Sequence, residues 1–219
     1  MTEDDMIYLK QSFNIEPASP ATRDRVVETV NKYVLPANER LGARLVAAFF
    51  AHEEWFSQII HITEFDDLAA LGAYRDASGK DGQASEGVAQ MANLAPEQRS
   101  EIVEPLGPIA VDTLHGAIAA SASEPVKTYQ FAILDVNPGK MDEFVAFLGA
   151  GASQVPIIAC WNDVVGNPNR VIDLWKGDTG RGGYRPSDPA QEAFFGPLRQ
   201  IARRENMMRL HVMPYSPLQ

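Results

Sequence analysis

The sequence has little positive charge and almost no cysteine. Its 19 Lys and Arg residues are outnumbered by 29 Asp and Glu residues, which gives a formal net charge of -10 at pH 7. Nucleic acids and anionic membrane surfaces are bound by concentrated Lys and Arg, so we expect neither nucleic acid nor a membrane as a partner. The single cysteine, Cys160, cannot form an internal disulfide, and a reducing compartment therefore suits the chain.

Long apolar runs and clustered metal ligands are also missing. No window approaches the length of apolar sequence that a membrane helix requires, and the acidic start lacks the basic region of a signal peptide. We therefore expect a cytoplasmic protein. The four histidines are scattered, and no glycine-rich stretch stands in phosphate-loop register, so we expect no metal ion and no cofactor.

What the sequence does contain is an internal repeat. The stretches 57–65 and 169–177 each hold a polar pair and a β-branched run, with His61 and Asp173 at the same place inside the run. A repeat of this kind indicates that the two halves of the chain have the same fold. Three blocks align without gaps: Tyr8 to Pro17 on Tyr129 to Pro138 (129 minus 8 is 121), Val46 to Phe65 on Ile158 to Gly177 (158 minus 46 is 112), and Ile102 to Ile109 on His211 to Leu218 (211 minus 102 is 109).

Each half shows the pattern strand, helix, strand, strand, helix, strand. Alternating apolar residues predict strands, and Ser19-Pro20 predicts a helix start whose helix is interrupted near Val34 by Pro36. The Gly-, Ser- and Asp-rich residues 76–87 predict an exposed loop, and residues 96–101 carry a weak helical signal before a final strand over 102–109.

This βαββαβ order is ferredoxin-like. Each half would form an antiparallel sheet with helices on one face, and the two uncovered apolar faces would pack together. We therefore predict an α+β fold in which two repeats form a dimeric α+β barrel within one chain. The domains are 1–115 and 126–219, and 116–125 is the linker. A tandem barrel satisfies its own sheet faces, so either a monomer or a homodimer is compatible with it.

The same residues resemble the NIPSNAP family. Leu35-Pro36-Ala37-Asn38-Glu39-Arg40-Leu41-Gly42 and Gln58-Ile59-Ile60-His61-Ile62 carry the resemblance in the first half, and Pro138-Gly139-Lys140 and Val171 to Trp175 carry it in the second. The resemblance implies the dimeric α+β barrel superfamily, which includes cofactor-free monooxygenases, lactone isomerases and polyketide cyclases. It implies no catalytic residues, because the family pattern has no agreed catalytic set. Asp173 stands where that pattern often has His.

The parity of the repeated strands gives a site hypothesis. Alternate residues of a strand share one face. The more polar set around His61 and Asp173 would line the barrel interior, and the aliphatic set around Ile60 and Ile172 would pack under helices. His61 could then act as a general base beside Asp173. The alternative is a buried histidine that is simply hydrogen-bonded.

Other residues are candidates for substrate binding. Tyr8 and Tyr129 could donate a hydrogen bond or be core residues, and Arg170 could bind a carboxylate or be a solvated strand end. Trp161 and Trp175 could wall an aromatic pocket or belong to the core. His211 could lie exposed at the barrel rim or be functional. The glycine- and proline-rich stretch 179–189 could be a lid or an ordinary surface loop.

Two functions from different classes follow. The first is a cofactor-independent isomerase, cyclase or oxygenase that acts on a small apolar or aromatic carbonyl compound with His61 as its base. The second is a non-catalytic protein that binds such a ligand or another protein. The fold does not choose between them, because α+β barrels host both.

Overall fold

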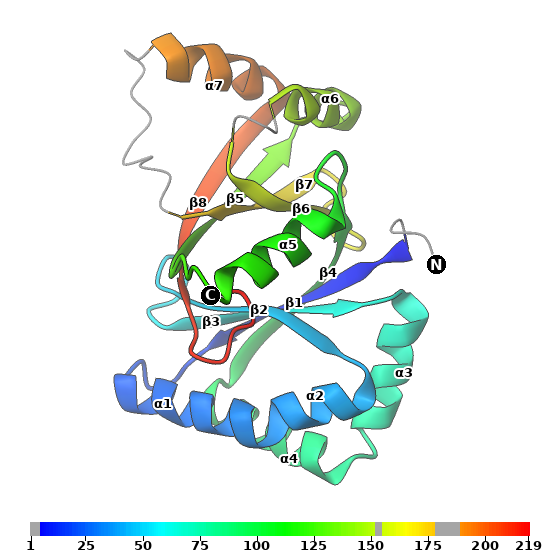
Figure 1. The fold of residues 1–219 in the computed structure, drawn as a ribbon, viewed down its shortest axis with the longest axis vertical. Helices are drawn as coiled ribbons and strands as arrows, with labels where there is room; N and C mark the ends of the chain where they lie inside the picture. Colours follow the sequence, from blue (N-terminus) through cyan, green and yellow to red (C-terminus); the bar gives the residue numbers. More distant parts are fainter. Residues whose placement is uncertain (1–4, 152–154, 178–188) are drawn as a thin grey trace.

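One closed barrel organises the chain (Figure 1). The computed structural model describes residues 5–151, 155–177 and 189–219. Within these residues, the strands follow the order β1-β3-β2-β8-β5-β7-β6-β4 around the barrel, and each strand pairs antiparallel with both of its neighbours. The strands are β1 (Ile7–Asn14), β2 (Arg44–Ala51), β3 (Gln58–Phe65), β4 (Glu97–Pro105), β5 (Thr128–Val136), β6 (Ile157–Asp163), β7 (Arg170–Lys176) and β8 (Ala202–Val212).

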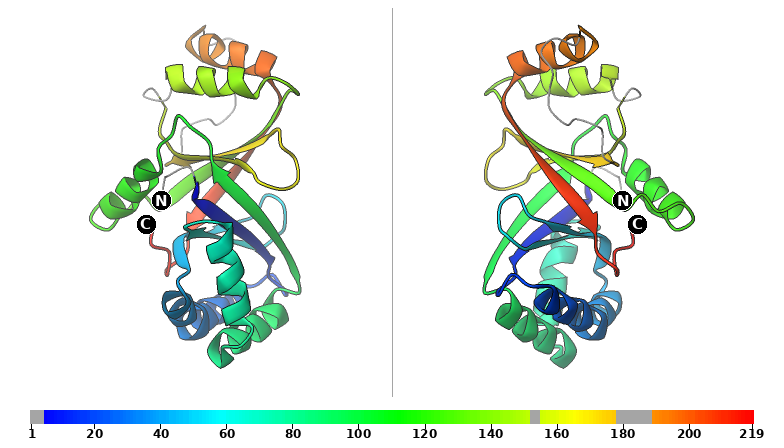
Figure 2. Two further views of the ribbon diagram at one scale, coloured as in Figure 1. Left: turned by 90° about the vertical axis from the view of Figure 1, so that its right-hand side faces the viewer. Right: turned by 90° about the vertical axis from the view of Figure 1, so that its left-hand side faces the viewer.

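Helices cover the outside of the barrel on two opposite sides. Those of the first half lie on one side and those of the second half on the opposite side, while the connecting helix lies along the flank (Figures 1 and 2). The first set is α1 (Pro20–Thr29), η2 (Val30–Val34, a π-helical turn), α2 (Leu35–Leu41), α3 (Leu68–Ser78) and α4 (Gly82–Leu94). The connecting helix is α5 (Val111–Ser121), and the second set is α6 (Met141–Gly151) and α7 (Pro189–Ile201).

Strand pairing shows that the two halves are equivalent. Tyr8 pairs with Glu64 in the first half, and Tyr129 pairs with Lys176 in the second, which reproduces the predicted offsets of 121 (129 minus 8) and 112 (176 minus 64). Each half has the ferredoxin-like strand order, β4-β1-β3-β2 and β8-β5-β7-β6. The predicted α+β barrel is confirmed.

The predicted offset of the third repeat block is wrong by two residues. Tyr8 pairs with Val103 and Tyr129 with Leu210, so the last strands are related by 107 residues (210 minus 103) and not by 109. Two prolines with matching spacing caused the error. The strand of the first half also begins earlier than predicted, at Glu97, because residues 97–101 pair with β1 and are not helical.

The prediction for the faces of the repeated strands is wrong. The core cluster that joins both halves contains Ile60, Ile62, Ile172 and Leu174, so the aliphatic set fills the barrel interior. Ile59 packs instead in a cluster with residues of α1 and α4. A closed barrel of this size must be filled by side chains, and aliphatic groups fill it without leaving polar atoms unpaired. His61 and Asp173, which have the opposite parity, therefore lie on the outside, under the helices.

Two further observations concern helices. Residues 82–87, expected in a loop, begin α4, because Asp81 caps the helix by accepting a hydrogen bond from the Ala84 N–H at 2.8 Å. Residues 116–121 of the predicted linker lie in α5. None of the helices in the described residues is long and apolar enough to span a membrane.

The interruption expected at Pro36 is confirmed and takes the form of the π-helical turn η2. Proline has no N–H, so the carbonyl of Lys32, four residues before it, loses its helical partner. The Gln83 side chain of α4 donates to that carbonyl at 2.8 Å and accepts from Arg40 at the same distance. Gly42 then ends the helix in the left-handed conformation, with φ of 79°.

Candidate functional site

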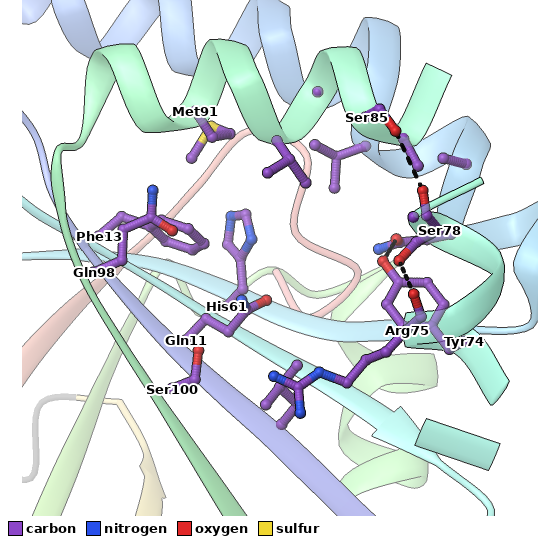
Figure 3. A pocket seen from close by; sticks show the side chains of 18 residues that line it. Gln11, Phe13, His61, Tyr74, Arg75, Ser78, Ser85, Met91, Gln98 and Ser100 are labelled. Carbon is purple, nitrogen blue, oxygen red and sulfur yellow. Dashed lines mark hydrogen bonds between the residues drawn. The ribbon is translucent and has the colours of Figure 1, made fainter. Parts of the chain in front are cut away.

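A cavity of about 560 Å³ lies between the first-half sheet and its covering helices (Figure 3). We call it the sheet–helix cavity. Phe13 and His61 form part of its wall on the sheet side, and Val34 and Met91 form part of its wall on the helix side. Arg75 and Val88 are exposed at its rim, so the cavity opens to solvent there. Its volume is within the range of small-molecule sites in proteins.

His61 is a titratable group on the inner wall of this cavity. Its side chain projects from β3 toward α4, and the edge of its ring meets Phe13 at 5.1 Å between ring centroids. The residue is 4% exposed, and burial lowers the pKa of the imidazole to about 4. His61 is therefore neutral at pH 7, with one of its two ring nitrogens protonated.

A hydrogen bond from Tyr215 fixes which nitrogen carries that proton. The Tyr215 hydroxyl lies 2.8 Å from His61 Nε2, and burial raises the pKa of the hydroxyl, which stays protonated. Neither the hydroxyl nor Nδ1 has another hydrogen bond within the described residues. If Nε2 donated, the buried Tyr215 hydrogen would be left without an acceptor, so the hydroxyl donates to Nε2. The Nδ1–H group of His61 is then the donor left for a ligand.

Tyr215 reaches His61 because the C-terminal tail folds back over the first half. The Met213 N–H donates to the Ala48 carbonyl, and the Ala48 N–H donates to Ser216 Oγ, both at 2.9 Å. Ser216 in turn donates to the Leu218 carbonyl at 2.7 Å. The residue that corresponds to Tyr215 in the tail of the first half is Pro108 (215 minus 107). The first-half tail therefore supplies no equivalent tyrosine to the second-half sheet.

Comparison with known proteins agrees with this architecture. Residues 17–108 match the model of the family described as NIPSNAP. The first half is NIPSNAP-like. The matched region runs from just before α1 to the residues after β4. It therefore includes β3 and the helices over the sheet–helix cavity. No curated protein matches the chain.

Solved structures resemble the chain over almost its whole length. A proposed monooxygenase from Fusobacterium nucleatum has a TM-score of 0.62 at 10% identity, and the alignment covers 96% of this chain and 94% of that one. A proposed monooxygenase from Lactobacillus acidophilus has a TM-score of 0.57 at 11% identity, covering 94% and 93%. An anthrone oxidase-like protein has a TM-score of 0.57 at 13% identity, covering 97% and 94%. At such identities the likeness establishes the dimeric α+β barrel fold alone.

The fold does not bring the predicted catalytic pair together. His61 lies beneath the first-half helices, whereas Asp173 neighbours Cys160 on the outer face of the second half. Burial raises the pKa of the Cys160 thiol, and the Asp173 carboxylate raises it further, so this thiol is inert at neutral pH. The expected cavity shared by His61 and Asp173 is absent from the described part of the chain.

The predicted substrate-binding residues are scattered as well. Tyr8, Tyr129 and Trp161 pack inside the barrel, with Tyr8 and Trp161 ring centroids 5.4 Å apart, and Tyr129 donates to the Gln219 carbonyl at 2.8 Å. Trp175 packs in the cluster beneath α6 and α7. His211 is exposed. The proposed lid falls on residues that lie, apart from Pro189, outside the described residues.

Arg170 lines a separate cavity of about 550 Å³ at one mouth of the barrel. Its guanidinium pairs with Glu101 and lies 3.2 Å from Asp163, and Lys10 pairs with Glu101 as well. Burial lowers the pKa of the Arg170 guanidinium, but bonding and attraction to Glu101 and Asp163 outweigh it and raise the pKa overall. The cationic groups of Lys10 and Arg170 are thus already neutralised by protein carboxylates. Arg170 belongs to an ion-pair network, which corrects its prediction as a solvated strand end.

The sequence patterns did not indicate the contact of Tyr215 with His61 or the start of α4 at Gly82. Tyr215 contacts His61 across a sequence separation of 154 residues, and no local pattern signals such a contact. The Asp81 cap could have revealed α4, because Asp before a helical stretch is a start signal.

Proposed function

We propose that the protein binds a small, largely apolar molecule in the sheet–helix cavity, with the Nδ1–H of His61 as the hydrogen-bond donor to an oxygen of the ligand. The observation that carries this proposal is a buried, neutral histidine on a cavity wall with one ring nitrogen held by Tyr215 and the other without a partner in the described residues. Buried polar groups are normally hydrogen-bonded, so a ligand oxygen completes the site.

The shape and lining of the cavity support a compact apolar ligand. Phe13 and Met91, both buried, present apolar surface on one side of the His61 ring (Figure 3). Apolar contact supplies most of the affinity in such a site, and a few placed polar groups supply orientation. An aromatic or aliphatic carbonyl compound satisfies both requirements.

General-base catalysis by His61 is a poor fit to the same geometry. A group whose pKa is near 4 is a weak base at neutral pH, and efficient bases have pKa values near the working pH. The Nδ1–H donor suits a different catalytic role, the stabilisation of negative charge that develops on a carbonyl oxygen. A cofactor-independent isomerase, cyclase or oxygenase reaction is therefore the second candidate, with His61 as donor and without Asp173.

The proposal includes the setting expected from the sequence. The barrel closes within one chain, so a monomer suffices for a site built from the first half and its own C-terminal tail. A cytoplasmic location is also part of the proposal.

A matched pair of probes tests the proposal. 2-Acetylnaphthalene carries a carbonyl oxygen, whereas 2-ethylnaphthalene has nearly the same shape and lacks that oxygen. We expect both to bind, and the ketone to bind roughly tenfold more tightly, since a hydrogen bond to an otherwise unpaired buried group contributes about 1–2 kcal/mol. Binding is measured by quenching of probe fluorescence or by calorimetry.

Two variants show whether His61 causes the preference. His61→Phe should abolish the preference for the ketone and keep binding of the hydrocarbon. His61→Phe alone leaves the Tyr215 hydroxyl without a partner, which could itself weaken binding of both probes. The double variant His61→Phe/Tyr215→Phe removes both polar partners and should restore any binding lost for that reason. If neither probe binds, or if the ketone preference survives in both variants, the proposed function is wrong.

A further inference from the structure

Arg75 is the one charged side chain on the lining of the sheet–helix cavity, since His61 is neutral. It extends from α3 along the cavity toward the strands that carry Gln11 and Ser100 (Figure 3). Within the described residues, Arg75 forms no ion pair and no hydrogen bond through its side chain. A cation without a partner on the wall of an apolar cavity is suited to an anionic ligand.

The surroundings of Arg75 differ from those of the arginines that pair with protein carboxylates. Arg40 pairs with Asp81, Arg170 with Glu101 and Arg199 with Glu192. The chain has ten more acidic than basic groups (29 minus 19), so carboxylates are available to neutralise an arginine on most of its surface. The lining of the cavity contains no Asp or Glu at all among the described residues, which leaves the charge of Arg75 available to a ligand.

Gln98 lies beside Phe13 and donates to the Ala95 carbonyl, whereas the polar side chains near Arg75 are separated from Phe13 and Met91 by His61 (Figure 3). Gln11 and Ser100 project from the sheet near Arg75, and neither side chain has a hydrogen bond within the described residues. Phe13 and Met91 lie farther along the cavity, on the other side of His61 (Figure 3). A ligand that matches this division has an apolar body and one polar, negatively charged end.

We propose that the ligand of this cavity is a small apolar carboxylate whose anionic group is bound by Arg75, with help from Gln11 and Ser100, while its body packs against Phe13 and Met91. This inference rests on the proposed function and narrows its ligand class. The guanidinium group matches a carboxylate through two parallel hydrogen bonds. A phosphate ester, with up to two negative charges, would require further cations that the cavity lining lacks.

Acid and amide pairs test this inference in the full chain. We use benzoate with benzamide and 2-naphthoate with 2-naphthamide, since each pair differs in charge and hardly in shape. At pH 7 and low salt, we expect the wild-type protein to bind the better-fitting acid roughly tenfold more tightly than its amide, as a charge-assisted hydrogen bond predicts. Added salt should reduce that preference, because Arg75 is exposed at the rim.

Arg75→Gln should abolish the preference for the acid and leave the affinity for the amide unchanged. Lys80→Gln is the matched control, because it makes the same change in net charge close to α3 at a residue that does not line the cavity. Equal binding of acid and amide by the wild type, or a preference that survives Arg75→Gln, overturns the inference. The 2-acetylnaphthalene measurement separates the two proposals: if that ketone binds through His61 and acids show no preference, the proposed function stands and the inference on Arg75 is wrong.

Discussion

His61 Nε2 and the Tyr215 hydroxyl are 2.8 Å apart although 154 positions separate the two residues in the sequence. Their rings are perpendicular, with centroids 5.6 Å apart. The bond joins the first-half sheet to the C-terminal tail and fixes the imidazole tautomer. The position of the C-terminal tail therefore determines which ring nitrogen of His61 can donate to a ligand in the cavity.

Removal of the Tyr215 hydroxyl should release the tautomer of His61. In the wild type, nitrogen-detected NMR of the histidine rings should show His61 protonated at Nδ1. Tyr215→Phe should convert this signal into a mixture of tautomers and lower the free energy of unfolding by about 1 kcal/mol, the usual contribution of one hydrogen bond. Tyr33→Phe, on the outer helix layer, is the control and should change neither quantity. A wild-type signal from Nε2–H would contradict the assigned direction of the bond.

Protonation of His61 should destabilise the protein in acid. The pKa in the folded chain is about 4, against 6.5 in the unfolded chain, so the unfolded state binds more protons between these values. Stability is therefore fully present above pH 6.5 and falls as the pH drops toward 4. The loss attributable to His61 is roughly 3 kcal/mol at 1.36 kcal/mol per pKa unit.

The acid effect is isolated by urea unfolding at several pH values. Carboxylates also titrate in this range, so the wild type is compared with His61→Phe, in which the fall between pH 6.5 and 4 should be shallower. His211→Gln, at an exposed histidine, should keep the wild-type slope. Parallel curves for the wild type and His61→Phe would show that His61 is not held neutral by burial.

Two glycines in the helices over the cavity should respond in opposite directions to substitution by alanine. A Cβ atom at Gly87 of α4 would lie 3.0 Å from Tyr33 Cβ and 3.4 Å from Val34 Cγ2, whereas one at Gly72 of α3 meets no atom within 4 Å. We expect Gly87→Ala to lower the free energy of unfolding by roughly 1 kcal/mol through overpacking. Gly72→Ala should raise it by about 0.5–1 kcal/mol through helix propensity. Equal stabilisation by both variants in thermal or urea unfolding would show that α4 has room to move.

Gln83 should stabilise the docking of α4 on the π-helical turn. It donates to the Lys32 carbonyl that Pro36 leaves without a helical partner, and it also accepts from Arg40. Gln83→Ala should cost about 1 kcal/mol in urea unfolding. Gln90→Ala, on the same helix, removes only a bond to Glu86 and should cost much less. Equal losses in the two variants would contradict this role for Gln83.

The fold could be predicted from the sequence because the two repeats share local patterns of turn residues and apolar runs. Turn residues and apolar runs recur at offsets of 121 and 112, and strand pairing reproduces both. It was insufficient for the faces of β3, because every residue of that strand is buried, and alternation does not separate two buried faces. His61 was identified as a site residue, but on the wrong side of the sheet and with Asp173 as the wrong partner. Tyr215 comes from a distant tail, and Arg75 from a helix surface where an arginine is unremarkable in sequence.

The most direct test of the central claim is the structure of the protein with 2-acetylnaphthalene bound, determined by crystallography. We predict that the naphthalene ring lies between Phe13 and Met91, with the carbonyl oxygen within hydrogen-bond distance of His61 Nδ1. A ligand bound in the barrel-mouth cavity beside Arg170, or one whose oxygen points away from His61, would contradict the account.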